Sequence, residues 1–338
     1  MNVEEVLAAI SGATPTSVRR ELSRWATEVP AFAAFLIANS AKVQRKLRHA
    51  RTRYDVRDVL AELEFVKRLA RNSSFNITYE PYDKSVRNPD LLVQAAEIAA
   101  FNVDVKRIRE SPAMLKYEAF EAAVFAACKG VPSSLGISLI ARDVEAKPEL
   151  ADRLQAGLES IVAHLTARLL CLQRVLEPGE SVDEPIPGFQ GELDFHVFRL
   201  PGKALDTSTV WLGGIAPVLY TQKESLKFGD QICSALGQLR PGMPNVLGIR
   251  LDSSAHEPME VDCALAELYH LAEAGDHAFF QQKGFRDARD YLGGLSRLTV
   301  IVVCGWDLVV TEARNHVWQN SNCEIHLPKS VLDFFAVM

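Results

Sequence analysis

The sequence predicts an α/β protein, because segments with helical spacing and segments with strand-like alternation follow one another along its 338 residues. Residues 53–71 carry apolar side chains at helical spacing, residues 101–106 alternate apolar and polar side chains, and residues 114–129 are again helical. At roughly 100–200 residues per domain, this length corresponds to about two domains or to one elaborated domain. The hydrophobic content of 48% allows a large core and excludes wholesale disorder.

The composition also limits the cellular setting that we expect. No apolar run approaches the roughly 18–20 residues that a membrane-spanning helix needs. The sequence opens without a basic region before an apolar one, so we expect no secretory signal. The six cysteines form no C-x-x-C pair and have no histidine at zinc-finger spacing, which argues against a zinc site or a disulfide scaffold. We therefore expect a cytoplasmic protein with reduced cysteines and no contact with a membrane.

The elements expected between residues 53 and 141 follow the order α-β-β-β-α-β. Before them, residues 15–50 are expected to be helical, and Pro30 should break or restart that helix. The helix over 53–71 is the strongest, because its apolar residues form a single stripe. The elements that follow are strands near 75–79, 89–93 and 101–106, a helix over 114–129 and a strand over 135–141.

The remainder of the chain repeats the same mixture of helices and strands. The helix-then-strand pattern of residues 114–141 recurs at 223–251, which indicates one extended sheet or a weak duplication. The other expected elements are a helix over 148–176, a loop over 177–191, and strands over 193–199, 210–215 and 298–303.

Charge is distributed unevenly along the chain. Residues 15–71 carry 13 Lys and Arg and 6 Asp and Glu, a net charge of +7, whereas the whole chain has a net charge of −6. Within this segment, Lys42, Arg45, Lys46, His49 and Arg53 recur at three- and four-residue spacing, so on a helix they share a face. Such a face is typical of contacts with a nucleic-acid backbone. An ordinary solvated helix face is the alternative.

Two aspartates are expected to face each other across a β-hairpin. If the chain turns about residue 97, Asp90 lies opposite Asp104 on the neighbouring strand, where Cβ atoms are about 4.5–5.5 Å apart. Alternation places Asp104 and Lys106 on one face of the strand and Phe101, Val103 and Val105 on the other. Two carboxylates at that distance repel unless a cation lies between them or one is protonated. Mg²⁺, with its preference for oxygen ligands, suits this pair.

Other charged side chains are expected near this pair. Lys106 can orient or deprotonate a water, or stabilise charge on a phosphate. Glu62 lies at the edge of the apolar stripe of the 53–71 helix, where it could add a ligand, and Glu64 lies further round. Arg107 and Arg109 could contact a phosphate, with simple solvent exposure as the alternative.

Glu62, Pro89-Asp90 and Asp104-Val105-Lys106, on elements in the order α-β-β-β-α-β, resemble the motifs of the PD-(D/E)xK nuclease superfamily. The resemblance covers about residues 53–141. It implies a restriction-endonuclease-like core with a mixed central sheet flanked by helices. By it, Asp90, Asp104, Glu62 and the carbonyl of Val105 would hold Mg²⁺ or Mn²⁺, and Lys106 would be the catalytic lysine. The implied reaction is metal-dependent hydrolysis of a phosphodiester bond, in DNA more often than in RNA.

With this resemblance, three regions are expected. They are a basic helical segment over 1–52, a nuclease-like core over 53–145, and an α/β extension over 146–338 that could continue the core sheet. The partner expected is nucleic acid, most often DNA. The acidic C-terminal part could in addition mediate a homodimer or bind a partner protein.

Two alternatives compete with this interpretation. An acidic-x-Lys triplet is common by chance, and the chain has a second one at Glu145-Ala146-Lys147 without a paired carboxylate on a strand. The charges of Asp90, Asp104 and Lys106 could therefore form an ordinary ion pair on an exposed hairpin, and Glu62 could pair with a nearby base on a helix surface. At the level of function, the rival is a non-catalytic module that binds nucleic acid or protein and retains the fold.

Overall fold

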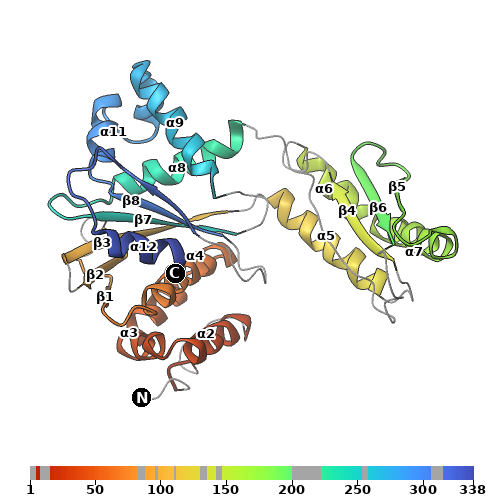
Figure 1. The fold of residues 1–338 in the computed structure, drawn as a ribbon, viewed down its shortest axis with the longest axis horizontal. Coiled ribbons are helices and arrows are strands. Elements are labelled where there is room, and N and C mark those ends of the chain that lie inside the picture. The colour runs from red at the N-terminus through yellow and green to blue at the C-terminus, as the bar shows by residue number, and fades with distance from the viewer. Residues whose placement is uncertain are drawn as a thin grey trace. The chain divides into compact units, whose positions relative to one another are not determined.

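The protein forms two compact units, and each is described by itself (Figure 1). The first unit combines Met1–Ile108 with Gln222–Met338, and the second comprises Arg109–Thr221. The second unit is therefore an insertion within the first along the chain. A computed structural model describes residues 5–7, 16–82, 88–95, 98–109, 112–129, 135–141, 147–199, 222–252, 258–305 and 315–338.

A six-stranded mixed sheet forms the centre of the first unit, in the order β1-β2-β3-β7-β8-β9. Strands β1, β2 and β3 pair antiparallel, β3, β7 and β8 pair parallel, and β9 returns antiparallel to β8. The α/β class and the mixed sheet flanked by helices are confirmed. The strands are β1 (Asn76–Tyr79), β2 (Leu91–Ala95), β3 (Ile98–Ile108), β7 (Asn245–Leu251), β8 (Val300–Cys304) and β9 (His316–Gln319).

Helices cover both faces of this sheet (Figure 1). One hydrophobic cluster packs Phe101, Val103 and Val105 of β3 against the N-terminal and C-terminal helices. A second cluster packs Leu247 and Ile249 of β7 against the helices that follow residue 222. The first layer consists of α2 (Thr16–Glu28), α3 (Pro30–His49), α4 (Arg53–Leu69) and α12 (Lys329–Val337), and the second of α8 (Gln222–Leu236), α9 (Glu260–Glu273), α10 (His277–Gln282) and α11 (Ala288–Leu295).

Local sequence signals set where these helices begin. Pro30 occupies the first turn of α3 and separates it from α2, as expected from its missing N–H. Thr52 caps α4 and forms a capping box with Asp55. Helix α4 then packs closely on the sheet, because a Cβ at Gly248 would lie 2.5 Å from the Phe65 ring. Glycine in β7 therefore allows the helix that carries Glu62 to approach the strands.

The hairpin of β2 and β3 has the expected register. Leu91 pairs with Val103 and Leu92 with Asn102, so the residue before β2 falls opposite Asp104. A bulge between Val93 and Ala95 shifts the register only near the turn. The predicted register is thus confirmed at the end of the hairpin that carries the aspartates.

The second unit holds a separate antiparallel sheet in the order β4-β6-β5. Its buried residues alternate along β6, where Leu193, Phe195 and Val197 face inward. Its elements are α5 (Pro112–Lys129), β4 (Gly136–Ala141), α6 (Pro148–Ala156), α7 (Leu158–Val175), β5 (Ser181–Pro185) and β6 (Leu193–Phe198). The single helix expected over 148–176 is interrupted at Gly157, and the strand expected over 210–215 lies outside the described residues.

The expected core over 53–145 differs from the structure at its C-terminal end. Helix α5 and strand β4 belong to the second unit, whereas α8 and β7 supply the helix and the strand beside β3. Both helix-then-strand pairs have the same hydrophobic pattern, and periodicity does not encode which strand pairs with β3. Part of the expected extension over 146–338, from residue 222 onward, does continue the core sheet.

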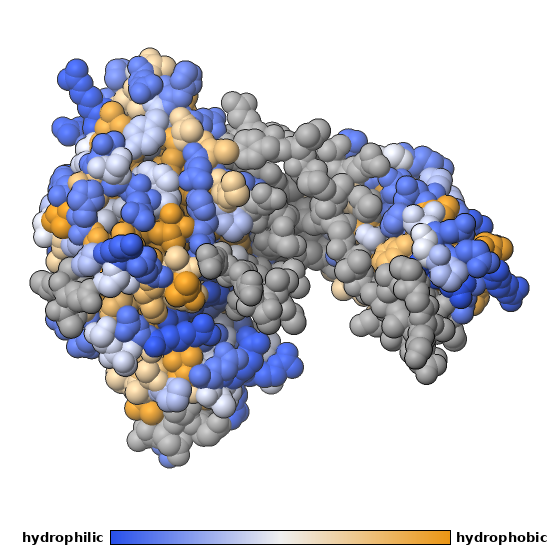
Figure 2. Space-filling view, in the orientation of Figure 1, coloured by the Kyte–Doolittle hydropathy of each residue, from blue (hydrophilic) through white to orange (hydrophobic). Residues whose placement is uncertain are grey.

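Surface features of the described residues bear on possible partners. None of the described helices combines the length and the apolar character that a bilayer crossing demands. Among the described residues of the first unit, the large exposed apolar side chains Met259, Leu292 and Val337 lie in separate segments of the chain. In Figure 2, orange apolar side chains are correspondingly interspersed with blue hydrophilic ones.

Candidate active site

Asp90 and Asp104 meet at the start of the β2–β3 hairpin. Asp90 lies one residue before β2, and its Oδ2 accepts a hydrogen bond from the Val105 backbone N–H at 2.9 Å. The side chain of Asp104 is fully buried, and Asp104 directly precedes the Val105 N–H that Asp90 accepts from. The structure therefore brings together two carboxyl groups from different strands, at the positions that the register predicts.

Lys106 lies beside the same pair. Its Nζ is 2.9 Å from Asp104 Oδ2. Gln238, just beyond the end of α8, bridges the two residues when its amide oxygen faces Lys106. In this orientation the oxygen accepts from Lys106 Nζ at 2.7 Å, and the nitrogen donates to Asp104 Oδ1 at 3.1 Å. The ion pair that the alternative proposes does form between Lys106 and Asp104, but in a buried rather than an exposed part of the hairpin, because the Asp104 side chain is 0% exposed.

The Asp104 carboxyl group is buried beside a single ammonium group. Its Oδ2 lies 2.9 Å from Lys106 Nζ, although the angles are not those of a hydrogen bond. Burial raises the pKa of Asp104 to about 8, Lys106 opposes this shift, and the neighbouring Asp90 adds to it. When both are ionised, the two aspartates carry more negative charge than the ammonium beside them balances, which favours a proton or one hard divalent ion at this pair.

The set of metal ligands is small in the part of the chain that the structure describes. No group of three or more His, Cys, Asp or Glu side chains there is arranged to hold a metal ion. Asp90 and Asp104 are thus the carboxylates available for a shared ion. Val105 is placed next to them through its N–H, and a role of its carbonyl as a ligand stays a prediction.

Glu62 points from α4 into this region, as its place on the apolar stripe suggests. Its Oε2 accepts hydrogen bonds from Lys46 Nζ at 2.5 Å and from the Tyr79 hydroxyl at 2.7 Å. Burial raises its pKa to about 7, and the charge of Asp90 contributes further. Glu62 does pair with a base, as the alternative proposes, but in a buried position rather than on a helix surface, since its side chain is 13% exposed.

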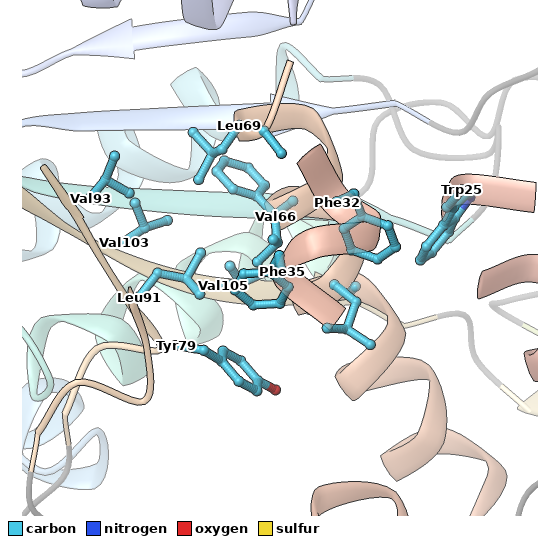
Figure 3. Close-up of a cluster of buried hydrophobic side chains, with 14 of the residues drawn as sticks. Trp25, Phe32, Phe35, Val66, Leu69, Tyr79, Leu91, Val93, Val103 and Val105 are labelled. Atoms are coloured by element: carbon cyan, nitrogen blue, oxygen red, sulfur yellow. The ribbon is translucent and has the colours of Figure 1, made fainter. Parts of the chain in front are cut away.

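The Tyr79 side chain connects the core to the acidic cluster. Its ring packs against Phe35 with centroids 5.8 Å apart, and in Figure 3 its hydroxyl points away from Leu91 and Val93. The hydroxyl thereby reaches Glu62. Burial, followed by the charge of Glu62, raises the pKa of Tyr79 well above its ordinary value, so Tyr79 acts as a donor.

The basic face expected on α3 is turned toward the hairpin. Lys46 contacts Glu62, Lys42 donates to the backbone carbonyls of Tyr79 and Glu80, and Arg45 donates to the Glu80 carboxylate. The expectation that these three cations bind nucleic acid thus conflicts with the partners they have here. The spacing of the residues predicts a shared face correctly, but it does not reveal whether acids or solvent lie opposite.

The arginines assigned to phosphate binding divide into two groups. Arg107 is buried, with 2% of its side chain exposed, and it donates to Asp58, Asp252 and the Tyr54 carbonyl. It is therefore a structural residue, a correction that follows from alternation, because it projects to the opposite face of β3 from Lys106. Arg53 and Arg109 are exposed, as a contact with a ligand requires.

Several neighbours of the site do not follow from sequence patterns. Glu80 follows β1 with a φ of 44°, an uncommon value for a residue other than glycine, and its N–H donates to the Asp90 carbonyl at 2.8 Å. Gln238 reaches the site from beyond α8. Neither residue belongs to a local motif, since both are brought to the aspartates by tertiary structure. Glu64, the second choice on α4, instead pairs with Arg68 and Arg250.

Comparisons with known proteins identify no relative of this chain. No protein-family model matches the sequence, and neither a curated protein nor a solved structure is significantly similar to it.

Proposed function

We propose that the protein is a metal-dependent nuclease that hydrolyses phosphodiester bonds, with DNA as the preferred substrate. The observation that carries this proposal is the meeting of Asp90, Asp104 and Lys106, with Lys106 Nζ 2.9 Å from an oxygen of the fully buried Asp104 side chain. Strongly shifted carboxyl groups beside a lysine are typical of catalytic centres.

The roles follow from the positions of the side chains. Asp90 and Asp104 would hold Mg²⁺, or Mn²⁺ in its place, with the Val105 carbonyl as a further ligand and Glu62 as support. A bound ion of this kind lowers the pKa of a coordinated water and neutralises charge at the phosphate. Lys106 would orient the attacking water or donate to a phosphate oxygen, and Gln238 would keep its ammonium next to Asp104.

The topology supports a restriction-endonuclease-like core. The elements α4, β1, β2 and β3 come first along the chain, and α8 and β7 follow after the inserted second unit. The parallel pairing of β3 with β7 completes the order α-β-β-β-α-β. In this proposal the first unit carries the chemistry, and exposed cations such as Arg53 contribute to binding of the backbone.

Cleavage of plasmid DNA tests the proposal. We expect cleavage with Mg²⁺, none with EDTA, and a loss of about 100-fold or more in Lys106→Ala and Asp104→Asn, because a proton-transferring group contributes roughly 10²–10⁴-fold. Lys147→Ala is the matched control, since Lys147 ends the other acidic-x-Lys triplet and is 45% exposed. Equal cleavage by Lys106→Ala and the wild type would contradict the proposal. Salt-dependent binding of DNA without cleavage would favour the non-catalytic alternative.

A further inference from the structure

Arg240 is linked to both aspartates of the candidate active site. Gln238, two residues before it, contacts Asp104, and in the same orientation its nitrogen donates to the Asn88 carbonyl at 3.1 Å. The side-chain oxygen of Asn88, two residues before Asp90, accepts from Arg240 Nε at 3.2 Å and from Nη2 at 2.6 Å. The guanidinium group of Arg240 is therefore tied to the segment that carries Asp90.

The ring of Tyr82 lies against the Arg240 guanidinium group, with Cζ 3.7 Å from the ring centroid. The Tyr82 hydroxyl donates to Asn102 Oδ1 at 2.6 Å. Asn102 shares a face of β3 with Asp104, and two residues of a strand correspond to about 7 Å. This spacing is equivalent to about two nucleotides along one strand of B-DNA.

The backbone of Arg240 is also fixed. Asn245, which begins β7 and is fully buried, accepts from the Arg240 N–H at 3.2 Å and donates to the Arg240 carbonyl at 2.8 Å. The same Asn245 oxygen accepts from Asn102 Nδ2 at 3.1 Å. Main chain and side chain are thus both held in place, and such preorganisation lowers the entropic cost of binding a ligand.

The positive charge of Arg240 has no carboxylate partner among the described residues, because Asn88 and the Tyr82 ring are neutral. Lys46 and Arg107, by contrast, each pair with acids of the first unit. Asn88 occupies the Nε–Nη2 edge of the guanidinium group, which leaves Nη1 without an acceptor in the part of the chain that the structure describes. Arg240 is half-buried, so a ligand can reach it.

We propose that the Arg240 guanidinium group, stacked on Tyr82, binds an internal phosphate of a nucleic-acid strand close to the phosphodiester bond that is cleaved. This inference rests on the proposed function, since it assigns a further contact of the same substrate. A planar guanidinium group can donate two N–H bonds to one phosphate, and the ring beside it leaves these donors available. Arg240 is then a substrate-binding residue.

Binding of a short fluorescein-labelled DNA duplex, measured by anisotropy in EDTA, tests the contact without metal or cleavage. We expect Arg240→Gln to weaken binding by about tenfold at low salt and to lower the salt dependence by about one ion. Arg286→Gln is the matched control, because Arg286 is 87% exposed and pairs with Asp290, and it should bind like the wild type. Wild-type affinity and salt dependence in Arg240→Gln would overturn the inference.

Two further measurements sharpen this test. Tyr82→Leu keeps every charge but removes the ring beside Arg240, so it should weaken binding by about threefold, and Tyr82→Phe should lose less. Circular dichroism checks that the variants are folded. If Arg240→Gln does not fold, equal affinities of Tyr82→Leu and the wild type overturn the inference. A loss in Arg240→Gln that is confined to duplexes with a 5′-phosphate would overturn the contact with an internal phosphate.

The outcomes separate this inference from the proposed function. Cleavage by the wild type, together with equal DNA binding by Arg240→Gln and the wild type, would overturn the role of Arg240 and leave the nuclease proposal standing. DNA binding that depends on Arg240, without cleavage in Mg²⁺, would support the phosphate contact and contradict the nuclease. Neither binding nor cleavage by the wild type would overturn both.

Discussion

Glu62 and Glu64 lie two residues apart on α4, both buried, yet their surroundings have opposite effects. Two arginines, Arg250 and Arg68, outweigh burial and lower the pKa of Glu64. Burial and the nearby Asp90 raise the pKa of Glu62 to about 7, although Lys46 opposes them. In the Glu64 cluster the two arginines compensate the charge of the carboxylate, so this cluster serves to stabilise the fold. The Glu62 cluster, which reaches Asp104 through Asp90, has more acid than base, and under the proposed function it would take up a cation.

Among substitutions, the largest difference in stability is expected between neutral variants of these two residues. Glu64→Gln weakens hydrogen bonds to Arg68 and Arg250 and leaves their charges buried, so it should lower the free energy of unfolding by about 3 kcal/mol. Glu62→Gln removes a carboxylate whose ionised form is disfavoured, and it should cost less than about 1 kcal/mol. Urea unfolding at pH 7 with EDTA measures both. A larger loss in Glu62→Gln would reverse the contrast between the clusters.

The metal-free protein should lose stability as the pH rises from 5 to 8. In the folded state the pKa values of Glu62 and Asp104 are about 7 and about 8, above the ordinary values of 4.5 and 3.8. Unfolding then releases protons across this window, so a higher pH favours the unfolded chain, by about 6 kcal/mol at most in total. Thermal unfolding at several pH values in EDTA checks the sign. The unfolding temperature should depend less on pH in Asp104→Asn. A stability that rises between pH 5 and 8 would contradict the raised pKa values of Glu62 and Asp104.

Added Mg²⁺ should reverse that loss most strongly at high pH. The ion competes with protons for Asp90 and Asp104, so its stabilisation of the folded state should be greater at pH 8 than at pH 6. A concentration ten times the dissociation constant corresponds to about 1.4 kcal/mol. Differential scanning calorimetry with and without Mg²⁺ measures the effect, with Asp104→Asn as the control that should not respond. An equal effect at both pH values would indicate binding elsewhere.

The smallest effect is expected at the exposed cations. Arg53→Ala should change the free energy of unfolding by less than about 0.5 kcal/mol, because the side chain is exposed. If Arg53 contacts a phosphate, the variant should reduce the salt dependence of DNA binding by about one ion. Fluorescence anisotropy over a range of salt concentrations measures this slope. An unchanged slope would remove Arg53 from the binding surface.

The acid pair could be predicted from the sequence because it depends on local rules. Strand alternation and a short hairpin fix Asp104 and Lys106 on one face and set Asp90 opposite Asp104. The helical stripe likewise directs Glu62 toward the sheet. These relations involve residues that are near in sequence or follow one period, and no knowledge of the whole fold is needed.

The rest of the site depends on tertiary structure. Lys46 belongs to a basic helix face that looks like a nucleic-acid contact until the acids of the hairpin are placed opposite it. Arg107 follows Lys106 directly but is buried on the other face with Asp58 and Asp252. Strand β7 pairs with β3 after an insertion of more than one hundred residues, whereas the equally strand-like β4 does not. Hydrophobic period alone does not distinguish such choices.

The most direct test of the central claim is the location of Mn²⁺ in a crystal of the wild-type protein at pH 8. The account predicts an anomalous scattering peak in contact with the carboxylates of both Asp90 and Asp104, with Lys106 beside it. The absence of a peak there at saturating Mn²⁺ would contradict it.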